Sequence, residues 1–415
     1  MFVDLTPEQH ALRITIRDYF VALMTPELRQ RMRGVECGDE YRNLVRKIGR
    51  DGWLSVGWPK EYGGQGFTAT EQLIFFEEAN IAGAPLPFVT INTVAPTLMS
   101  YGTAAQKERF LPGMAMGDIV FSIGYSEPSA GSDLAALTTK ATLDGDHFVV
   151  NGAKIWTSGI EAADFVWLAV RTDPHRARHR GISIIIVDTR AEGFSYTLIQ
   201  TVGTMTSATY YNNVRVSRDL LVGELHGGWK LIMAQLNHER LGLGAWSDRI
   251  FDSFRRVYLW ARIPDDSGRR AVDQPWVRTS LAECYARIEA MRLINFRIAA
   301  TLDAGEPDVA LCSATKIYGT ETTVDVLHKL VEIVGASALV RSDSAASVLM
   351  GDLEYEIRSA PINTFGGGTN EIQRELVAQD DERPHPRAEH ADGERGYQRA
   401  NHERVREGLR EQRHG

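Results

Sequence analysis

Cysteine is scarce in this chain of 415 residues. Its three cysteines, Cys37, Cys284 and Cys312, are isolated and lack the Cys-x-x-Cys or histidine spacing of a metal site. The sequence therefore predicts neither a disulfide framework nor a metal site. Unpaired cysteines of this kind fit a reducing compartment, and the cytoplasm is the predicted location.

Long hydrophobic runs and basic clusters are also missing. The longest aliphatic run, residues 182–187, is much shorter than the roughly 20 apolar residues that cross a bilayer. The N-terminus carries Asp4 and Glu8 where a secretory leader would carry basic residues. The net charge of -8 is dispersed, and Lys and Arg form no stripe. We therefore expect neither a membrane segment nor a nucleic-acid partner.

The chain does contain enough apolar material for several cores. Hydrophobic residues make up 43% of it, and a chain of this length usually folds as two or three packed units. Its hydrophobic period changes from helical to strand-like and back, and is lost near the C-terminus. The predicted fold class is α+β: an N-terminal helical domain, a central β domain, a C-terminal helical bundle and a polar tail, disordered or weakly helical. These parts are predicted at residues 1–118, 119–226, 227–379 and 380–415.

Local signals place the individual elements. Thr6, followed by Pro7 and Gln9, is typical of a capped helix start. Asp144-Gly145 lies between two β-branched runs and indicates a hairpin, because these residues tolerate a positive φ. The expected strands are residues 119–125, 137–143, 147–150, 165–171, 182–188 and 210–216, and the long helices of the bundle are residues 230–261, 277–304 and 308–334.

Three segments, each roughly a hundred residues from the next, carry the functional signal. They read GYSEPSAGSDLAA at 124–136, LNHERL at 236–241 and FGGGTNE at 365–371. Three such segments in this order are improbable by chance. Over roughly residues 1–378 the chain resembles the acyl-CoA dehydrogenases. This resemblance implies the three-domain fold of that family, FAD as cofactor and a CoA thioester as substrate.

Dehydrogenation of a thioester needs a base for the α-proton, donors that stabilise the enolate and an acceptor for the β-hydride, which a flavin supplies. The resemblance implies a carboxylate base at one of two positions. The commoner position is Gly367 here, so that base is missing. The alternative lies immediately before an Arg on a C-terminal helix, and Glu239 precedes Arg240. A solvated Glu-Arg pair would explain Glu239 in isolation, but the glycine at 367 favours Glu239 as the base, with Glu371 in reserve.

Further contacts follow from the same resemblance. The backbone N–H of Gly367 and a ribityl hydroxyl would bind the thioester oxygen as negative charge develops on it. Trp156 and Ser158 match the family's Trp-x-Thr/Ser beside the flavin, and Tyr125 replaces a small aliphatic residue. The residues expected to contact FAD are Ile123, Tyr125, Ser126, Trp156, Ser158, Thr369 and Glu371, and those expected to contact the CoA thioester are Ser132, Arg240 and Gly366.

Two segments that in homomeric relatives hold the neighbour's FAD are altered. The Arg-x-x-Phe-Gly-x-Pro segment corresponds to residues 269–275, with Val272 for Phe and Asp273 for Gly. The Gln-x-x-Gly-Gly segment corresponds to residues 332–336 and begins with Glu332. Carboxylates beside a diphosphate cost on the order of 1 kcal/mol even in water. We therefore expect a diverged sister subunit in an α2β2 heterotetramer, as in the heteromeric acyl-CoA dehydrogenases of actinobacterial steroid side-chain degradation.

That resemblance also suggests the substrate, a bulky steroid side-chain thioester such as 3-oxo-cholest-4-en-26-oyl-CoA, and an electron-transfer flavoprotein as electron acceptor. Alternatives stay open at this point. The chain could be a branched- or medium-chain acyl-CoA dehydrogenase, or an acyl-CoA oxidase that passes electrons to oxygen. A non-catalytic subunit that only completes a partner's site is a third interpretation, and Glu239 with the Trp156-x-Ser158 pair argues against it.

Overall fold

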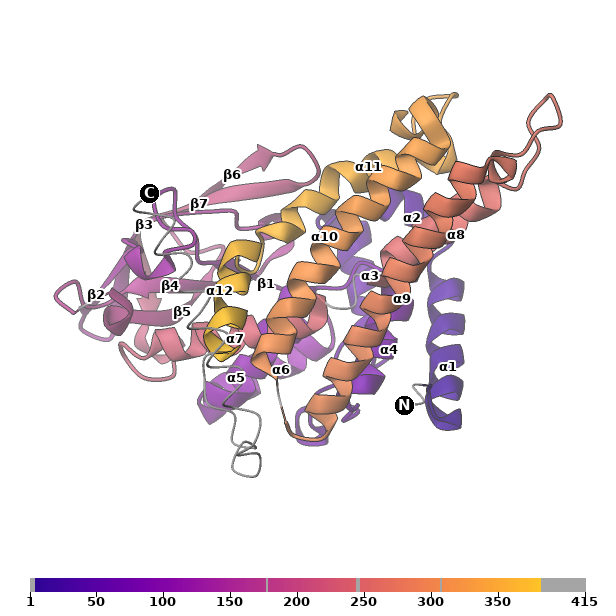
Figure 1. The fold of residues 1–415 in the computed structure, drawn as a ribbon. Helices are drawn as coiled ribbons and strands as arrows, with labels where there is room; N and C mark the ends of the chain where they lie inside the picture. Colours follow the sequence, from indigo (N-terminus) through magenta and orange to yellow (C-terminus); the bar gives the residue numbers. More distant parts are fainter. Residues whose placement is uncertain (1–3, 177, 244–246, 307, 382–415) are drawn as a thin grey trace, which may run out of the picture.

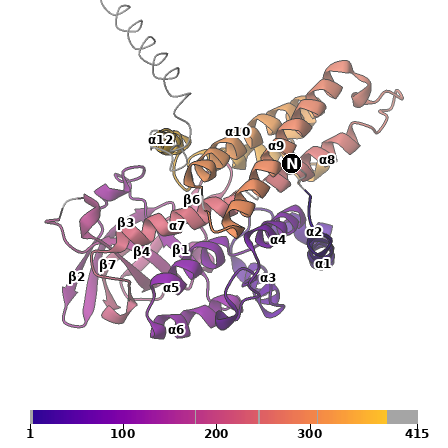
Figure 2. The same ribbon diagram turned by 60° about the horizontal axis from the view of Figure 1, so that its bottom comes forward.

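The computed structural model describes residues 4–176, 178–243, 247–306 and 308–381, with the backbone alone for residues 236–243, 247–248, 309 and 380–381. Helices, then a β-sheet, then long helices follow one another along the chain, which confirms the predicted α+β class (Figures 1 and 2). The predicted polar tail lies outside the described residues from 382 onward. Within the described part, no helix is both long and apolar enough to cross a bilayer.

The N-terminal region is helical, as predicted. Threonines cap three of its helices in reciprocal capping boxes, Thr6 with Gln9, Thr68 with Glu71 and Thr103 with Gln106. Each box satisfies backbone N–H groups that the first helical turn leaves without partners. The elements are α1 (Pro7–Leu23), α2 (Pro26–Met32), α3 (Gly38–Arg50), α4 (Ala69–Ala82), the π-helical segment η2 (Val89–Val94), α5 (Ala95–Tyr101) and α6 (Ala104–Ala115).

The central strands form one sheet in the order β6-β7-β3-β2-β4-β5-β8, with β1 pairing parallel to β4. β4 and β5 have the predicted bounds, and the predicted hairpin joins β2 to β3 through Gly145 at a φ of +60°. The strands are β1 (Phe121–Gly124), β2 (Lys140–Asp144), β3 (His147–Ile155), β4 (Phe165–Arg171), β5 (Ile182–Asp188), β6 (Phe194–Gln200), β7 (Met205–Ser217) and β8 (Leu221–Val222).

Several strands depart from the sequence prediction. β7 begins at Met205, five residues before its predicted start, and β8 is absent from the prediction. β3 continues to Ile155, five residues beyond its predicted end. The Asn151-Gly152 pair does not end the strand, because a β-bulge between Val150 and Gly152 accommodates it and pairing with β7 continues beyond it. β6 is absent from the prediction, although its sequence FSYTLIQ alternates between apolar and polar residues. The strand is mostly exposed and is held by pairing with β7 along its whole length. The extension of β3 matters for function because it carries Lys154 and leads directly into Trp156.

The C-terminal region is a helical bundle with α10 at its centre, in contact with α7, α8, α9, α11 and α12. α7 also packs on β5 and η2, so it joins the bundle to the rest of the molecule. The single helix predicted over 230–261 is two helices on either side of residues 244–246, which are not described. The helices are α7 (Gly228–Leu243), α8 (Ser247–Trp260), α9 (Pro275–Asp303), α10 (Val309–Val334), α11 (Asp352–Ser359) and α12 (Asn370–Asp381).

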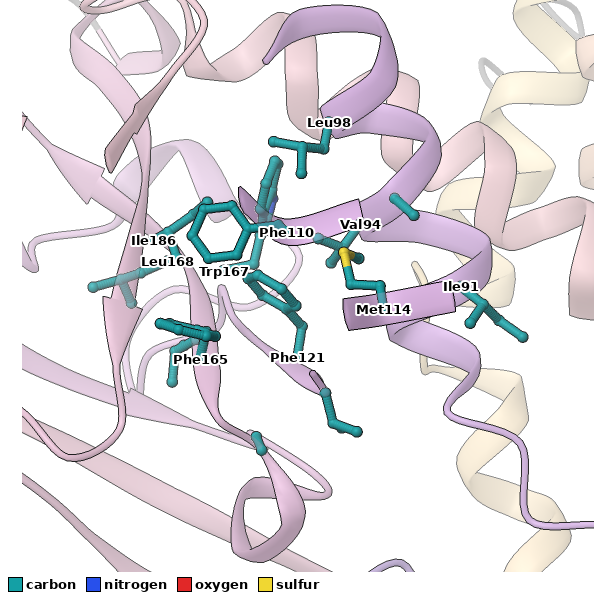
Figure 3. Close-up of a cluster of buried hydrophobic side chains, with 14 of the residues drawn as sticks. Ile91, Val94, Leu98, Phe110, Met114, Phe121, Phe165, Trp167, Leu168 and Ile186 are labelled. Carbon is teal, nitrogen blue, oxygen red and sulfur yellow. The ribbon is translucent and has the colours of Figure 1, made fainter. Parts of the chain in front are cut away.

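The N-terminal helices and the sheet share one hydrophobic core, while the bundle has its own. In the shared core, side chains of η2, α5 and α6 lie against β1, β4 and β5 (Figure 3). Phe110 contacts Phe121 and Phe165 edge to face, with ring centroids 5.7 and 5.2 Å apart. This packing fixes the start of β1, three residues before the first functional segment begins.

Candidate active site

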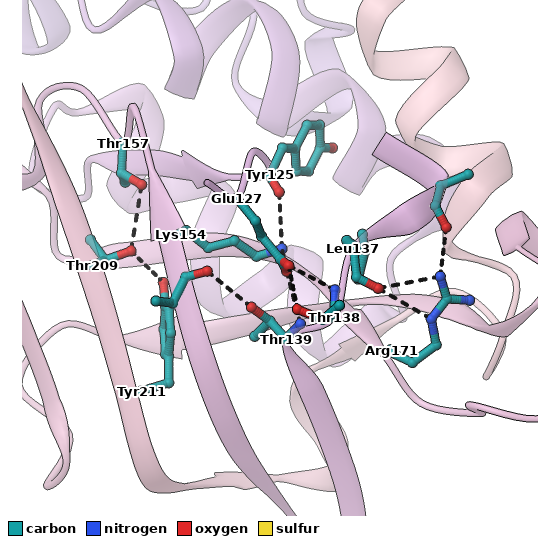
Figure 4. Close-up of polar contacts among 12 residues, drawn as sticks. Tyr125, Glu127, Leu137, Thr138, Thr139, Lys154, Thr157, Arg171, Thr209 and Tyr211 are labelled. Carbon is teal, nitrogen blue, oxygen red and sulfur yellow. Dashed lines mark hydrogen bonds and ion pairs between the residues drawn. The ribbon is translucent and has the colours of Figure 1, made fainter. Parts of the chain in front are cut away.

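The first functional segment leaves β1 and is fixed by a buried ion pair (Figure 4). The Glu127 carboxylate, 5% exposed, accepts from the backbone N–H groups of Thr138 and Thr139 and from the Thr138 hydroxyl at 2.7–2.8 Å. Lys154, fully buried on β3, donates to Glu127 Oε1 and to the backbone oxygen of Tyr125, both at 2.9 Å. The pair therefore ties the segment after β1 to the ends of β2 and β3.

Charge and burial oppose each other in this pair. Burial alone would raise the pKa of Glu127, but Lys154 and the donors of Thr138 and Thr139 outweigh it and lower the pKa to about 2. Burial lowers the pKa of Lys154 to about 8 in spite of the neighbouring carboxylate. Both groups are consequently charged at neutral pH.

Trp156 lies directly beyond this pair in a strained conformation. Its φ is +65°, a left-handed value that few residues other than glycine adopt, and its side chain is 57% exposed. The neighbouring Ile155 N–H donates to the oxygen of Ser126 at 2.9 Å, and the buried Thr157 N–H donates to the oxygen of Ser207 at 3.0 Å. The structure therefore brings Trp156 close to Ser126 and leaves the indole exposed beside it.

Ser158, two residues after Trp156, is exposed, and its hydroxyl lies 3.0 Å from the Thr206 hydroxyl. Ile123 is half-buried on β1 opposite Trp167 of β4. Ser132 is exposed on the segment after the Glu127–Ala130 bridge. The contacts of these three residues within the chain do not by themselves show which ligand each of them would bind.

Tyr125 connects this side of the molecule to α7. Its hydroxyl accepts from Trp167 Nε1 at 3.2 Å and donates to the Oε1 atom of Gln235, a fully buried residue of α7. Glu239 follows Gln235 by four residues, so both occupy the same face of this helix one turn apart. The side chains of Glu239 and Arg240 lie outside the described residues, and only their place on α7 is established.

The third functional segment is a turn between α11 and α12. Gly367 and Gly368 have φ values of +66° and +98°, and a Cβ at Gly368 would lie 2.8 Å from Nε2 of the fully buried Gln373. Both positions therefore favour glycine, and a glutamate at 367 would adopt a strained left-handed backbone. Gly366 is half-buried, and its N–H donates a hydrogen bond to the backbone oxygen of Ile362 at 2.8 Å.

The start of α12 places the last two predicted residues. Thr369 caps the helix by accepting from the Ile372 N–H at 3.3 Å. Glu371 is exposed in the first turn, where its own backbone N–H and the Thr369 hydroxyl hold the pKa of its carboxyl below the usual range. A lowered pKa makes Glu371 a weaker proton acceptor.

The two altered segments lie at the far end of the bundle. Asp273 is paired with Arg270 at 2.7 Å, and Val272 packs on the core of the bundle. Glu332 is exposed near the end of α10.

The sequence analysis does not single out Glu127, Lys154 or Gln235. A glutamate and a lysine in or beside strand-like segments could have suggested a buried ion pair. No sequence signal pairs Gln235 with Tyr125.

We predict that Glu127→Gln lowers the free energy of unfolding by about 3–5 kcal/mol, because it leaves the buried Lys154 ammonium without its counter-charge. The folded pKa of Glu127 lies below its unfolded value, so its stabilisation is present above pH 4.5 and is lost as the pH falls toward 2. Urea unfolding at pH 7 and pH 3.5 measures both effects. The control is Asp144→Asn, which removes an exposed ion pair to Arg215 and should change little. Equal effects of the two substitutions at pH 7 would contradict the assigned role.

Comparison with known proteins identifies the family. The sequence profiles of the N-terminal, middle and C-terminal domains of acyl-CoA dehydrogenases match residues 6–118, 122–214 and 226–380. Acyl-CoA dehydrogenase FadE26 of Mycobacterium tuberculosis is 50% identical over 390 residues, 91% of this chain and 97% of the relative. Acyl-CoA dehydrogenase FadE29 of the same organism is 45% identical over 381 residues, with coverage of 91% and 97%.

Solved structures give the same result. The Tcur3481-Tcur3483 steroid ACAD (acyl-CoA dehydrogenase) superposes with a TM-score of 0.88 at 50% identity, covering 92% of this chain and 98% of that one. The ChsE4-ChsE5 complex from Mycobacterium tuberculosis superposes with a TM-score of 0.87 at 50% identity, with coverage of 93% and 100%. With three matching domain profiles and half of its residues identical to named members, the chain belongs to the acyl-CoA dehydrogenase family of FAD-dependent oxidoreductases.

Proposed function

We propose that this chain is the base-bearing subunit of a heteromeric acyl-CoA dehydrogenase that acts on the CoA thioester of a steroid side chain. The observation that carries the proposal is the Tyr125–Gln235 contact. It joins the segment predicted to line the flavin to the helix that carries Glu239, and it does so one turn before that residue. Gly367 meanwhile occupies the other position of the family's base and has a left-handed φ.

The residues on the β side fit an FAD ring system. An exposed indole at Trp156 offers a flat apolar surface, and the hydroxyls of Ser126 and Ser158 offer polar partners at its edge. Thr369 at the start of α12 would hold the same cofactor from the C-terminal side, next to the helix N-terminus that favours negative charge. FAD, when bound, would accept the β-hydride together with its electron pair.

The chain's own residues would perform the remaining work. Glu239 would take the α-proton, so that its carboxylate becomes a carboxylic acid while the α,β double bond forms. The backbone N–H of Gly367 would donate to the thioester oxygen, on which negative charge builds as the proton leaves. Ser132, Arg240 and Gly366 would contact the CoA thioester, with Gly366 leaving space beside the reacting carbons.

The base assignment predicts that Glu239→Gln binds flavin normally but loses reduction by substrate by several orders of magnitude, because no other group takes the α-proton. Anaerobic bleaching of the flavin absorbance measures this directly. Glu371→Gln tests the reserve candidate, and Glu375→Gln on the exposed side of α12 serves as a matched control that should bleach at the wild-type rate. Near wild-type bleaching by Glu239→Gln would rule out this base.

A sister subunit is proposed from the two altered segments. Asp273 and Glu332 place carboxylates where homomeric relatives are expected to hold the neighbour's FAD, and Val272 is turned into the bundle core. The similar solved structures are described as a Tcur3481-Tcur3483 enzyme and a ChsE4-ChsE5 complex, each with two different chain names. Both observations support a partner that supplies the other half of the FAD site, with an electron-transfer flavoprotein accepting the electrons.

Co-expression with an adjacent acyl-CoA dehydrogenase-like gene should give an α2β2 tetramer with one FAD per heterodimer, since each site then needs one contribution from each chain. Expressed alone, this chain should be poor in flavin. Native mass spectrometry and flavin absorbance measure the stoichiometry. A stable homo-oligomer with one FAD per chain would overturn the proposal, and release of hydrogen peroxide in place of reduction of the flavoprotein would indicate an oxidase.

The glycine run and the name of one similar structure support a steroid substrate. Glycines at 366–368 remove side-chain volume beside the reacting carbons, and a structure 50% identical to this chain is described as a steroid ACAD. Binding energy from the fused rings would help to position the α and β carbons. 3-Oxo-cholest-4-en-26-oyl-CoA is the thioester that we propose.

The steroid thioester should therefore give a higher kcat/KM than octanoyl-CoA or isovaleryl-CoA with the reconstituted complex. Loss of the rings should lower turnover as well as affinity, because the rings contribute to positioning and not to binding alone. Steady-state assays with the three thioesters measure this. Equal or better use of the small thioesters would overturn the steroid assignment and leave the acyl-CoA dehydrogenase activity in place.

A further inference from the structure

A buried lysine of α10 holds the glycine run. Lys316 is 3% exposed, and its Nζ atom donates to the backbone oxygen of Thr364 at 3.1 Å, to that of Gly368 at 2.7 Å and to Oδ1 of Asn370 at 2.8 Å. An ammonium has three N–H donors, and these contacts give each of them an acceptor. The two backbone oxygens bracket Gly366 and Gly367.

The glycine run needs such support. Its residues have no side chains to pack, and fixing a residue's backbone costs on the order of 1–2 kcal/mol, with glycine at the upper end. Gly367 and Gly368 are nevertheless held at left-handed φ values. Lys316 binds the carbonyl oxygen of Thr364, three residues before Gly367, and that of Gly368, one residue after it, so a single side chain holds both ends of the turn that carries the Gly367 N–H.

Lys316 is itself held in a network between α10 and α12. Asn370 accepts from Lys316 and donates to the Thr320 hydroxyl and to Glu321 Oε1, both at 3.0 Å. Thr320 lies one turn after Lys316 on α10 and donates back to the Lys316 oxygen at 2.8 Å. The ammonium is therefore anchored by the helix that forms the centre of the bundle.

We propose that Lys316 is a positioning residue for the thioester carbonyl: it holds the turn in which the Gly367 N–H faces the thioester oxygen, and it keeps a buried positive charge at that turn. Because the charge is shielded from water, its field at the oxygen is stronger than that of an exposed lysine. This inference rests on the proposed function for the thioester site, and it concerns a different element from the proposed base.

Lys316→Met and Lys316→Gln test the proposal in the co-expressed complex. Lys316→Met removes the donors and the charge, and Lys316→Gln retains a neutral donor if the first variant folds poorly. Lys329→Met is the matched control, because Lys329 lies on the same helix, contacts Glu283 at 2.9 Å and does not touch the glycine run. The measurements are anaerobic flavin bleaching and pH titration of a bound 3-oxoacyl-CoA, whose enolate is detected by its absorbance.

We expect both Lys316 variants to lower the bleaching rate at saturating substrate about tenfold to a hundredfold, with KM changed much less. The ionisation midpoint of the bound 3-oxoacyl-CoA should rise by about one pH unit, a tenfold loss of enolate at fixed pH. A purely structural lysine would lower stability without moving this midpoint. An unchanged midpoint and rate in either folded variant would overturn the proposal.

Two outcomes separate this inference from the proposed function. If Glu239→Gln bleaches normally, the base assignment fails, but the ionisation of the bound 3-oxoacyl-CoA still reports on the oxygen site. If no acyl-CoA or 3-oxoacyl-CoA binds the wild-type complex, the proposed function itself fails. Should neither Lys316 variant fold, hydrogen exchange of residues 364–370 in the wild type decides, because rapid exchange would show that Lys316 does not order the glycine run.

Discussion

The ion pair of Glu127 and Lys154 is the interaction on which the β side of the site depends. Buried ion pairs are costly unless further hydrogen bonds satisfy them, and here the donors of Thr138 and Thr139 provide these bonds. The pair fixes the backbone of Tyr125 from one side. Trp156 follows two residues after Lys154, and its strained backbone is tolerated because both neighbours are bonded to adjacent segments.

On the C-terminal side, a second buried lysine likewise donates hydrogen bonds to backbone carbonyl oxygens. Lys154 donates to the carbonyl oxygen of Tyr125, and Lys316 donates to those of Thr364 and Gly368. In each case a buried ammonium holds the backbone of a functional segment. The Tyr125–Gln235 contact then connects the β side to α7, which packs on α10, the helix that carries Lys316. Rigid elements thus support every functional segment.

The sequence predicts the fold well where hydrophobic pattern alone decides it. β4 and β5 have their predicted bounds because continuous apolar runs end at turn residues, and Thr6 caps α1 through the predicted contact with Gln9. β6 is missed although its residues alternate between apolar and polar, because most of them stay exposed and the strand is held by its neighbour β7. Lys316 is missed for a related reason, since a lysine on a helix usually faces water and only the packing of α12 on α10 buries it.

We propose that Glu239 and Gly367 act on one thioester while other segments of the chain hold them in place. A structure of the co-expressed complex with a bound, unreactive thioester analogue tests it most directly. We expect the Glu239 carboxylate at about 3–3.5 Å from the α-carbon and the Gly367 N–H within hydrogen-bonding distance of the thioester oxygen. A carboxylate of the partner subunit at the α-carbon, with Glu239 in solvent, would contradict it.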